Sequence, residues 1–269
     1  MSSSSILTNG HAAKAVETPT TAAGPAYRLL VEQAVVPLCR WYLGAKRCAD
    51  FLVAVVLLVP AIPIVALAAL AIKLTSRGPM FYSQTRLGRD GEPFRLWKLR
   101  TMVHNAEALT GPVWSTTNDS RVTRVGRFLR ATHLDELPQL LNVLSGAMSL
   151  VGPRPERPEF VTRLQWEIPS YSERLRVSPG VTGLAQLKLP PDSDIHSVRR
   201  KLIYDLYYVR NVNPWLDLRI LIGTASYLLG TLAWFGWRIV ALPSNASIEE
   251  AVIAWNADTC PTLKRPAEQ

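Results

Sequence analysis

Residues 51–72 read FLVAVVLLVPAIPIVALAALAI and contain no charged residue. About twenty residues of this kind are long enough to cross the hydrocarbon core of a bilayer as a helix. Pro60 and Pro63 lie near the middle, where each removes a backbone hydrogen-bond donor and disturbs the preceding turn. The stretch therefore indicates a membrane helix that is disturbed at its centre.

Basic residues flank this helix at both ends, with Lys46 and Arg47 before it and Lys73 and Arg77 after it. Because cytoplasmic flanks are enriched in Lys and Arg, both ends favour the same side of the membrane. A helix that enters one leaflet, bends at the prolines and returns satisfies this pattern. A plain transmembrane helix is the commoner outcome for such a run, so the residues alone leave both open.

The chain of 269 residues is 48% hydrophobic, yet it carries a net charge of +9. That charge implies an anionic partner, such as nucleic acid, lipid headgroups or phosphorylated metabolites. Because the apolar residues are concentrated in uncharged stretches, we expect membrane lipid and no nucleic acid. Three cysteines without metal-site spacing indicate reduced thiols in or near a cytoplasm.

The segments outside the membrane helix give weaker patterns. Residues 1–25 lack a secretory signal and are expected to be a flexible leader. Residues 26–45 fit either an interfacial helix or an ordinary amphipathic helix packed on a core. The runs 81–87 and 94–100 alternate around an Asp-Gly turn and predict a hairpin, with Arg95 on one face of its second strand and Lys98 and Arg100 on the other.

Arginines occur at every third position of residues 118–132, which are predicted to be helical; they are Arg121, Arg124, Arg127 and Arg130. This spacing places the guanidinium groups along one flank of the helix, where their mutual repulsion indicates an anion nearby. Lipid headgroups and a substrate phosphate fit the first three arginines equally well. Arg130 differs because it is closest to the acidic pair that follows.

That acidic pair is Asp135 and Glu136, in the sequence HLDELPQ of residues 133–139. Its commoner explanation is a helix start, where Asp caps free amides and Glu favours the positive end of the dipole. The pair also suits phosphoryl transfer, because magnesium prefers carboxylate and phosphate oxygens and a free Asp can attack phosphorus. Arg130 and Arg154, the latter on a proline-stiffened loop, could brace phosphate oxygens as charge builds.

Farther along, helices are predicted over 138–145 and 195–208, with a loop rich in Gly and Pro over 178–186 between them. A second uncharged segment, over 220–237, either spans the membrane or lies in its interface. A short helix is predicted to start with a capping box at residues 247–250. The sequence contains no Walker loop, dinucleotide fingerprint, His-Glu-x-x-His helix or serine nucleophile elbow. Its four histidines are scattered and do not favour a zinc site.

A series of motifs resembles the bacterial sugar transferase family, the monotopic phosphoglycosyl transferases that act on polyprenyl phosphate. The motifs occur in order, and so many together make coincidence a poor explanation. They cover about residues 46–225 and comprise Lys46-Arg47 with Asp50 and the proline-broken run, then residues 78–86, 98–102 (KLRTM), 119–123 (DSRVT), 134–139 (LDELPQ), 148–155 (MSLVGPRP), 179–186 (PGVTGLAQ) and 204–208 (YDLYY).

The resemblance implies that Asp135 attacks the sugar-bearing phosphate of a nucleotide diphosphate sugar, expected to be a UDP-sugar. UMP would leave a phosphosugar–enzyme adduct, from which polyprenyl phosphate takes the sugar phosphate in a ping-pong cycle. Glu136, together with Asp135, would hold Mg²⁺. Arg130, Arg154 and Arg100 would bind substrate phosphates.

The resemblance also matches Pro63 to the kink of a re-entrant helix, with Pro60 as an additional proline that moves or shares the bend. Two departures stand out. Ala147 replaces an Asp usual in the family, and residues 187–190 (LKLP) replace a Gly-Arg whose arginine is proposed to bind substrate. Lys188, Arg199 or Arg200 are weak candidates to replace that arginine.

We therefore expect a mainly helical α+β protein at the bacterial inner membrane. Residues 46–77 would form a re-entrant helix, and residues 78–240 a cytoplasmic catalytic domain that carries a hairpin and interfacial amphipathic helices. Residues 241–269 would be a C-terminal extension. The protein would start a lipid-linked glycan, such as an exopolysaccharide or O-antigen unit, and hand it to downstream glycosyltransferases. The rival is a non-enzymatic basic scaffold that gathers anionic lipid or assembly partners. The sequence leaves open which sugar is transferred, the polyprenol length and whether a homodimer forms.

Overall fold

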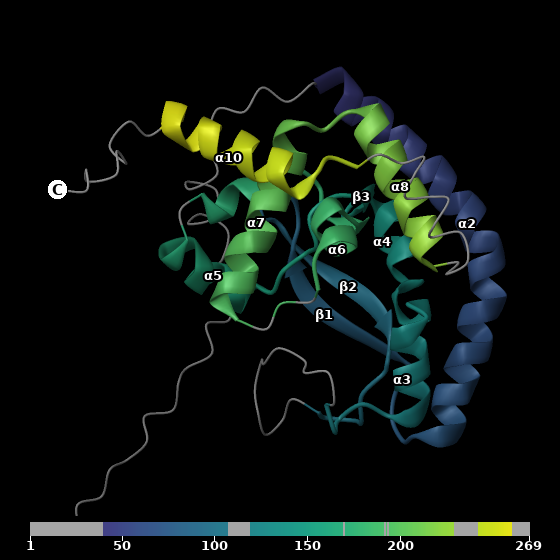
Figure 1. The fold of residues 1–269 in the computed structure, drawn as a ribbon. Helices are drawn as coiled ribbons and strands as arrows, with labels where there is room; N and C mark the ends of the chain where they lie inside the picture. Colours follow the sequence, from purple (N-terminus) through teal and green to yellow (C-terminus); the bar gives the residue numbers. More distant parts are fainter. Residues whose placement is uncertain are drawn as a thin grey trace, which may run out of the picture.

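The computed structural model describes residues 40–106, 119–168, 170–190, 192, 194–228 and 242–259. These residues form a mainly helical domain with two small two-stranded sheets (Figure 1). The expected leader at 1–25 and most of the expected interfacial helix at 26–45 lie outside the described residues, as does the end of the uncharged segment 220–237.

The longest element is helix α2 (Arg40–Thr75), which curves along one side of the domain (Figure 1). It continues through Pro60 and Pro63, and it also crosses the expected boundary at residue 45 without a break. Its domain-facing positions are small, as at Ala54 and Ala61, whereas its outer face carries exposed aliphatic side chains. Among the described helices, α2 is the one that is long and apolar enough to cross a membrane.

The predicted hairpin is confirmed. Strand β1 (Phe81–Leu87) pairs antiparallel with β2 (Pro93–Leu99), so that Phe81 lies opposite Leu99. The connecting turn holds a short helical turn, η1 (Arg89–Gly91), in which Asp90 has a φ of 56°. The hairpin ends beside helices α2 and α4, which brings the end of β2 to the acidic pair.

Helix α3 (Arg124–Ala131) begins later than predicted. Thr123 caps it by accepting a hydrogen bond from the amide of Gly126 at 2.9 Å. Arg121 therefore precedes the helix and pairs with Asp119 at 2.6 Å instead of extending the arginine stripe. The expectation that four arginines share one helical flank is wrong for this first member.

Helix α4 (Gln139–Ser145) agrees with the prediction and ends at Gly146, whose φ of 88° suits glycine. The Gly- and Pro-rich residues 178–186, predicted as a loop, instead form strand β4 (Gly180–Thr182) and helix α6 (Leu184–Lys188). Strand β4 pairs in parallel with β3 (Ser149–Val151). Gly180, which begins β4, and Gly152, which directly follows β3, approach each other too closely for a side chain at either position.

The remaining elements enclose the core. They are α5 (Pro158–Glu167), the short helical turn η3 (Tyr171–Arg176), α7 (Ile195–Arg210), α8 (Pro214–Leu228) and α10 (Asn245–Thr259). Helix α7 confirms the predicted helix over 195–208. Helix α10 begins before the predicted capping box, and Ser244 accepts from the amide of Ser247 at 3.1 Å. Ile248 joins the main core, so α10 packs on the domain.

Candidate active site

Asp135 lies in η2 (Leu134–Glu136), a single helical turn between α3 and α4. The turn begins at His133, whose φ of 57° is left-handed and uncommon for a residue other than glycine. The Asp135 residue is only 6% exposed, and no hydrogen bond to its carboxylate is formed by any residue that the structure describes. Its oxygens therefore remain available to a ligand.

The explanation of the acidic pair as a helix cap is wrong. Pro138 occupies the N-cap position of α4, and this helix has no side-chain cap. Neither carboxylate satisfies a free amide at the helix start. The pair needs a different explanation.

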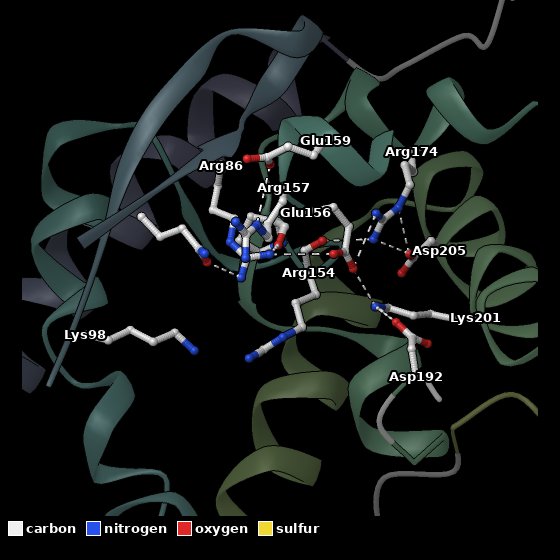
Figure 2. A network of polar contacts seen from close by, with 12 residues as sticks. Arg86, Lys98, Arg154, Glu156, Arg157, Glu159, Arg174, Asp192, Lys201 and Asp205 are labelled. Carbon is white, nitrogen blue, oxygen red and sulfur yellow. Dashed lines mark hydrogen bonds and ion pairs between the residues drawn. The ribbon is translucent and has the colours of Figure 1, made fainter. Parts of the chain in front are cut away.

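Glu136 is held between two cations from distant parts of the chain. Lys98, on β2, donates from Nζ to Oε1 of Glu136 at 2.6 Å. Arg154, on the loop after β3, donates from Nη2 to the same oxygen at 2.7 Å. Figure 2 shows the ends of Lys98 and Arg154 pointing toward one another. The loop arginine and the second residue of the acidic pair, both predicted for the site, are thus brought together.

The two neighbouring carboxyls have opposite electrostatic surroundings. Burial raises the pKa of Asp135 above its ordinary value; the charge of Lys98 opposes this rise and that of Glu136 adds to it. Burial also acts to raise the pKa of Glu136, but the charges of Arg154 and Lys98 outweigh it and hold that pKa well below its usual range. Glu136 thus stays ionised, while Asp135 is the more basic oxygen donor.

Arg130 contributes a third positive charge near the pair. It projects from the last turn of α3, and its Nε donates to Oγ1 of Thr101 at 2.9 Å. Its charge also acts to lower the pKa of Asp135. The predicted proximity of Arg130 to Asp135 therefore agrees with the structure.

Arg100 has separate contacts, at the end of α2. Its Nη2 donates to the carbonyl and the hydroxyl of Ser76 at 3.0 and 2.7 Å, and Arg100 is only 6% exposed. Its Nε and Nη1 are buried without a hydrogen-bond partner in the described part of the chain. The structure thus leaves Arg100 with spare donors, but its observed partner, Ser76, lies directly after the end of α2 and not at the acidic pair.

The other predicted cations lie elsewhere. Arg124 and Arg127 are exposed on α3. The side chain of Lys188 contacts Asn245 at 3.4 Å, and that of Arg199 contacts the carbonyl of Glu167 at 3.5 Å. These two contacts give no support to Lys188 or Arg199 as replacements for the family's missing arginine.

The donor set at the acidic pair fits magnesium better than a protein-enclosed metal. Across the described ranges, no three His, Cys, Asp or Glu side chains cluster as metal ligands. Within those ranges, no third such side chain joins Asp135 and Glu136 as a metal ligand. Magnesium commonly takes one or two carboxylates and completes its shell with water and substrate phosphates.

Lys98 contacts the acidic pair but was not among the site residues predicted from the sequence. Strand alternation placed it on the face opposite Arg95, which the structure confirms because Arg95 is exposed and Lys98 reaches Glu136. Asn142 of α4 was also missed. Its side chain accepts from the amide of Trp97 at 3.1 Å and donates to the carbonyl of Arg95 at 2.7 Å, which fixes β2 beside the pair.

Comparison with known proteins gives one family match, to the model described as bacterial sugar transferase, over residues 41–231. A UDP-glucose:undecaprenyl-phosphate glucose-1-phosphate transferase of Caulobacter vibrioides is 43% identical over 211 residues, covering 77% of this chain and 79% of that protein. An enzyme of the same name from Klebsiella pneumoniae is 42% identical, covering 66% of this chain and 39% of the relative. A UDP-N-acetylgalactosamine-undecaprenyl-phosphate N-acetylgalactosaminephosphotransferase of Aeromonas hydrophila is 41% identical, covering 70% and 44%. The chain thus spans less than half the length of the last two.

Proposed function

The chain belongs to the bacterial sugar transferase family, and on that premise we propose that it transfers a sugar 1-phosphate from a UDP-sugar to polyprenyl phosphate. The observation that carries the proposal is the Asp135 carboxylate, which is buried and receives no hydrogen bond from the described residues, beside a Glu136 that two cations keep ionised. Relatives named for transfer of glucose 1-phosphate and of N-acetylgalactosamine phosphate support the reaction class. Because these relatives are named for different sugars, they do not indicate which sugar this chain transfers.

In the first step, an oxygen of Asp135 attacks the phosphorus that carries the sugar. The bond from that phosphorus to the bridging oxygen breaks, UMP leaves with the bonding electrons, and an acyl phosphate joins Asp135 to the sugar phosphate. Arg154 and Arg130 lie on either side of the acidic pair in the chain and would stabilise the charge that develops on the non-bridging oxygens. The partial burial of Asp135 limits attack by water at this stage.

In the second step, a phosphate oxygen of the polyprenyl phosphate attacks the same phosphorus. The bond to Asp135 breaks, which regenerates the carboxylate and yields polyprenyl diphosphate sugar. The UDP-sugar and polyprenyl phosphate thus react with the same carboxylate in turn. This reaction would be the first membrane step of a lipid-linked glycan.

Magnesium belongs to this proposal through Asp135 and Glu136, the pair that would hold it. A Mg²⁺ ion held there would offset the negative charge of the diphosphate and so favour departure of UMP. The ion pairs of Glu136 with Lys98 and Arg154 keep its carboxylate ionised and oriented for this role.

The contacts of α2 favour a re-entrant helix on the cytoplasmic face over a spanning one. Near its start, Lys46 pairs with Asp217 of α8 at 2.6 Å, and near its end Ile72 is buried against Leu99 and Leu129. Both ends of a helix about 54 Å long are therefore attached to the one domain that carries Asp135. A spanning helix would draw that charged domain into the bilayer, whereas a helix within one leaflet leaves it at headgroup height.

Release of UMP tests the proposed reaction against the rival, a non-enzymatic scaffold. We expect the purified full chain to release UMP from at least one UDP-sugar when polyprenyl phosphate and Mg²⁺ are present, and to stop when EDTA removes the metal. Asp135→Asn should release none while still binding membranes. No release across a panel of UDP-sugars would favour the scaffold.

A further inference from the structure

The loop that carries Arg154 is fixed at every backbone carbonyl from Pro153 to Glu156. The four donors come from three elements, β4, η3 and β1. They are the amide of Gly180 to Pro153 at 2.9 Å, Nη2 of Arg174 to Arg154 at 2.9 Å, Nη1 of Arg86 to Pro155 at 3.1 Å and the amide of Leu87 to Glu156 at 3.0 Å. Two of the four donors are arginine side chains. Proline rings at 153 and 155 restrict the loop further.

Arg174, in η3, has every guanidinium nitrogen engaged. Its Nε and Nη2 both donate to Oδ2 of Asp205 on α7, at 3.0 and 2.7 Å, and its Nη1 donates to the Tyr171 hydroxyl at 3.1 Å. Arg174 and Asp205 are each 3% exposed. Figure 2 shows Arg174 between Asp205 and the loop, while the Arg154 side chain leaves this network toward Lys98.

Glu156 connects the two arginines that hold the loop. Its carboxylate lies 3.6 Å from Arg86, 3.8 Å from Arg174 and 2.8 Å from Lys201 of α7. Burial acts to raise the pKa of Glu156, but these three charges outweigh it and hold that pKa at about 2. Glu156 therefore stays ionised at neutral pH, and its contact with Lys201 ties the loop to α7.

We propose that Arg174, held by Asp205, is a positioning residue for Arg154: it fixes the backbone from which Arg154 reaches Glu136. This inference rests on the proposed function. Arg174 is buried behind the loop and does not contact the acidic pair, so its effect on catalysis must pass through Arg154. The Arg154 side chain is 36% exposed and long, so its reach depends on where its backbone is held.

The test is a double-mutant cycle on the full chain, with Arg174→Lys, Arg154→Lys and their combination. Lysine keeps the charge near Asp205 but cannot reproduce the arginine's several directed donors. We expect Arg174→Lys to lower kcat for UMP release by roughly 10- to 100-fold while KM for the UDP-sugar changes by less than about threefold. In the Arg154→Lys background the same substitution should lower kcat by less than about threefold, because coupled sites are not additive.

Arg163→Lys is the matched control, because Arg163 is exposed on α5 and its ion-pair partner among the described residues is Glu167 of the same helix. Its kcat for UMP release and its KM for the UDP-sugar should equal those of the wild type. If Arg174→Lys fails to fold, Arg86→Lys serves as the second variant, since it removes the Pro155 contact from the other side. Wild-type kcat in a folded Arg174→Lys or Arg86→Lys variant, or losses that multiply in the double mutant, would overturn the inference. Absence of UMP release by the wild type would instead overturn the proposed function.

Discussion

Asp135 and Glu136 are neighbours in sequence, yet the fold gives their carboxylates different tasks. Glu136 accepts short hydrogen bonds from Lys98 and Arg154 through Oε1, whereas Asp135 is buried without a partner among the described residues. The sequence singled out the acidic pair and Arg154, although the residue pattern by itself favoured a helix start for the pair and the catalytic roles came from the family resemblance. It did not identify Lys98, because the pair that Lys98 makes with Glu136 joins positions 38 residues apart.

Removing Lys98 should impair both the site and the fold. In Lys98→Met, Glu136 keeps only Arg154, and we expect the free energy of unfolding to fall by about 2 kcal/mol, the usual cost of losing a hydrogen bond to a charged group. The rate of UMP release should fall roughly 10- to 100-fold because the carboxylate is less well oriented. Thermal unfolding and steady-state kinetics measure the two effects. Arg95→Met, on the exposed face of the same strand, should change neither by a comparable amount.

The raised pKa of Asp135 predicts an acid limb in the reaction rate. Only the ionised carboxylate attacks phosphorus, and burial raises its pKa above the ordinary 3.8. As pH falls, the rate of the first step should therefore begin to decline while the pH is still above 3.8. Because one proton is taken up, the logarithm of the rate should then fall by one for each pH unit. Glu136, whose pKa is lowered, remains ionised through this range. A single-turnover rate that stays constant down to that pH would contradict this prediction.

At the scale of elements, sequence patterns predicted correctly those elements that are determined by residues near one another in the chain. The Asp-Gly turn predicted the hairpin, and apolar spacing predicted α4 and α7. The segment 178–186 was predicted wrongly because its glycines are explained by a close approach to β3, about thirty residues away in the chain. The start of α3 was also missed, because Thr123 and not the arginine spacing determines it.

Docking of α3 depends on Gly126, where a side chain would collide with the backbone of Thr101. Thr101 also accepts the hydrogen bond from Arg130, so a shift of α3 moves a residue of the proposed site. We expect Gly126→Ala to lower stability by about 1–3 kcal/mol through overpacking and to slow the first step. Gly44→Ala is the control: it lies in α2 with nothing within 4 Å, and should stabilise the helix slightly. Equal unfolding midpoints for the two variants would contradict the docking role.

At the scale of the whole molecule, α2 and the domain form one packed unit. The sequence predicted an apolar helix with basic residues at both ends. It did not predict that the small residues of this helix face the domain. Ala54 and Ala61 join the main core, and Ala68 joins a second cluster with Ile72. The outer face remains apolar and exposed, as at Val59 and Leu67, which suits lipid contact.

Labelling of both helix flanks tests the re-entrant arrangement. Cys48 is an exposed thiol before the apolar run, and Lys73→Cys adds one after it; Cys39 and Cys260 are replaced by Ser. We expect a membrane-impermeant maleimide to label both positions only from the cytoplasmic side. Labelling of the two positions from opposite sides would show that α2 spans the membrane.

The most direct measurement is the intact mass of the protein after incubation with a UDP-sugar and Mg²⁺, without polyprenyl phosphate. The account predicts that the wild type gains the mass of one sugar phosphate, that peptide mapping places it on Asp135, and that Asp135→Asn gains nothing. An adduct of unchanged yield in Asp135→Asn, or one mapped to another residue, would contradict the central claim.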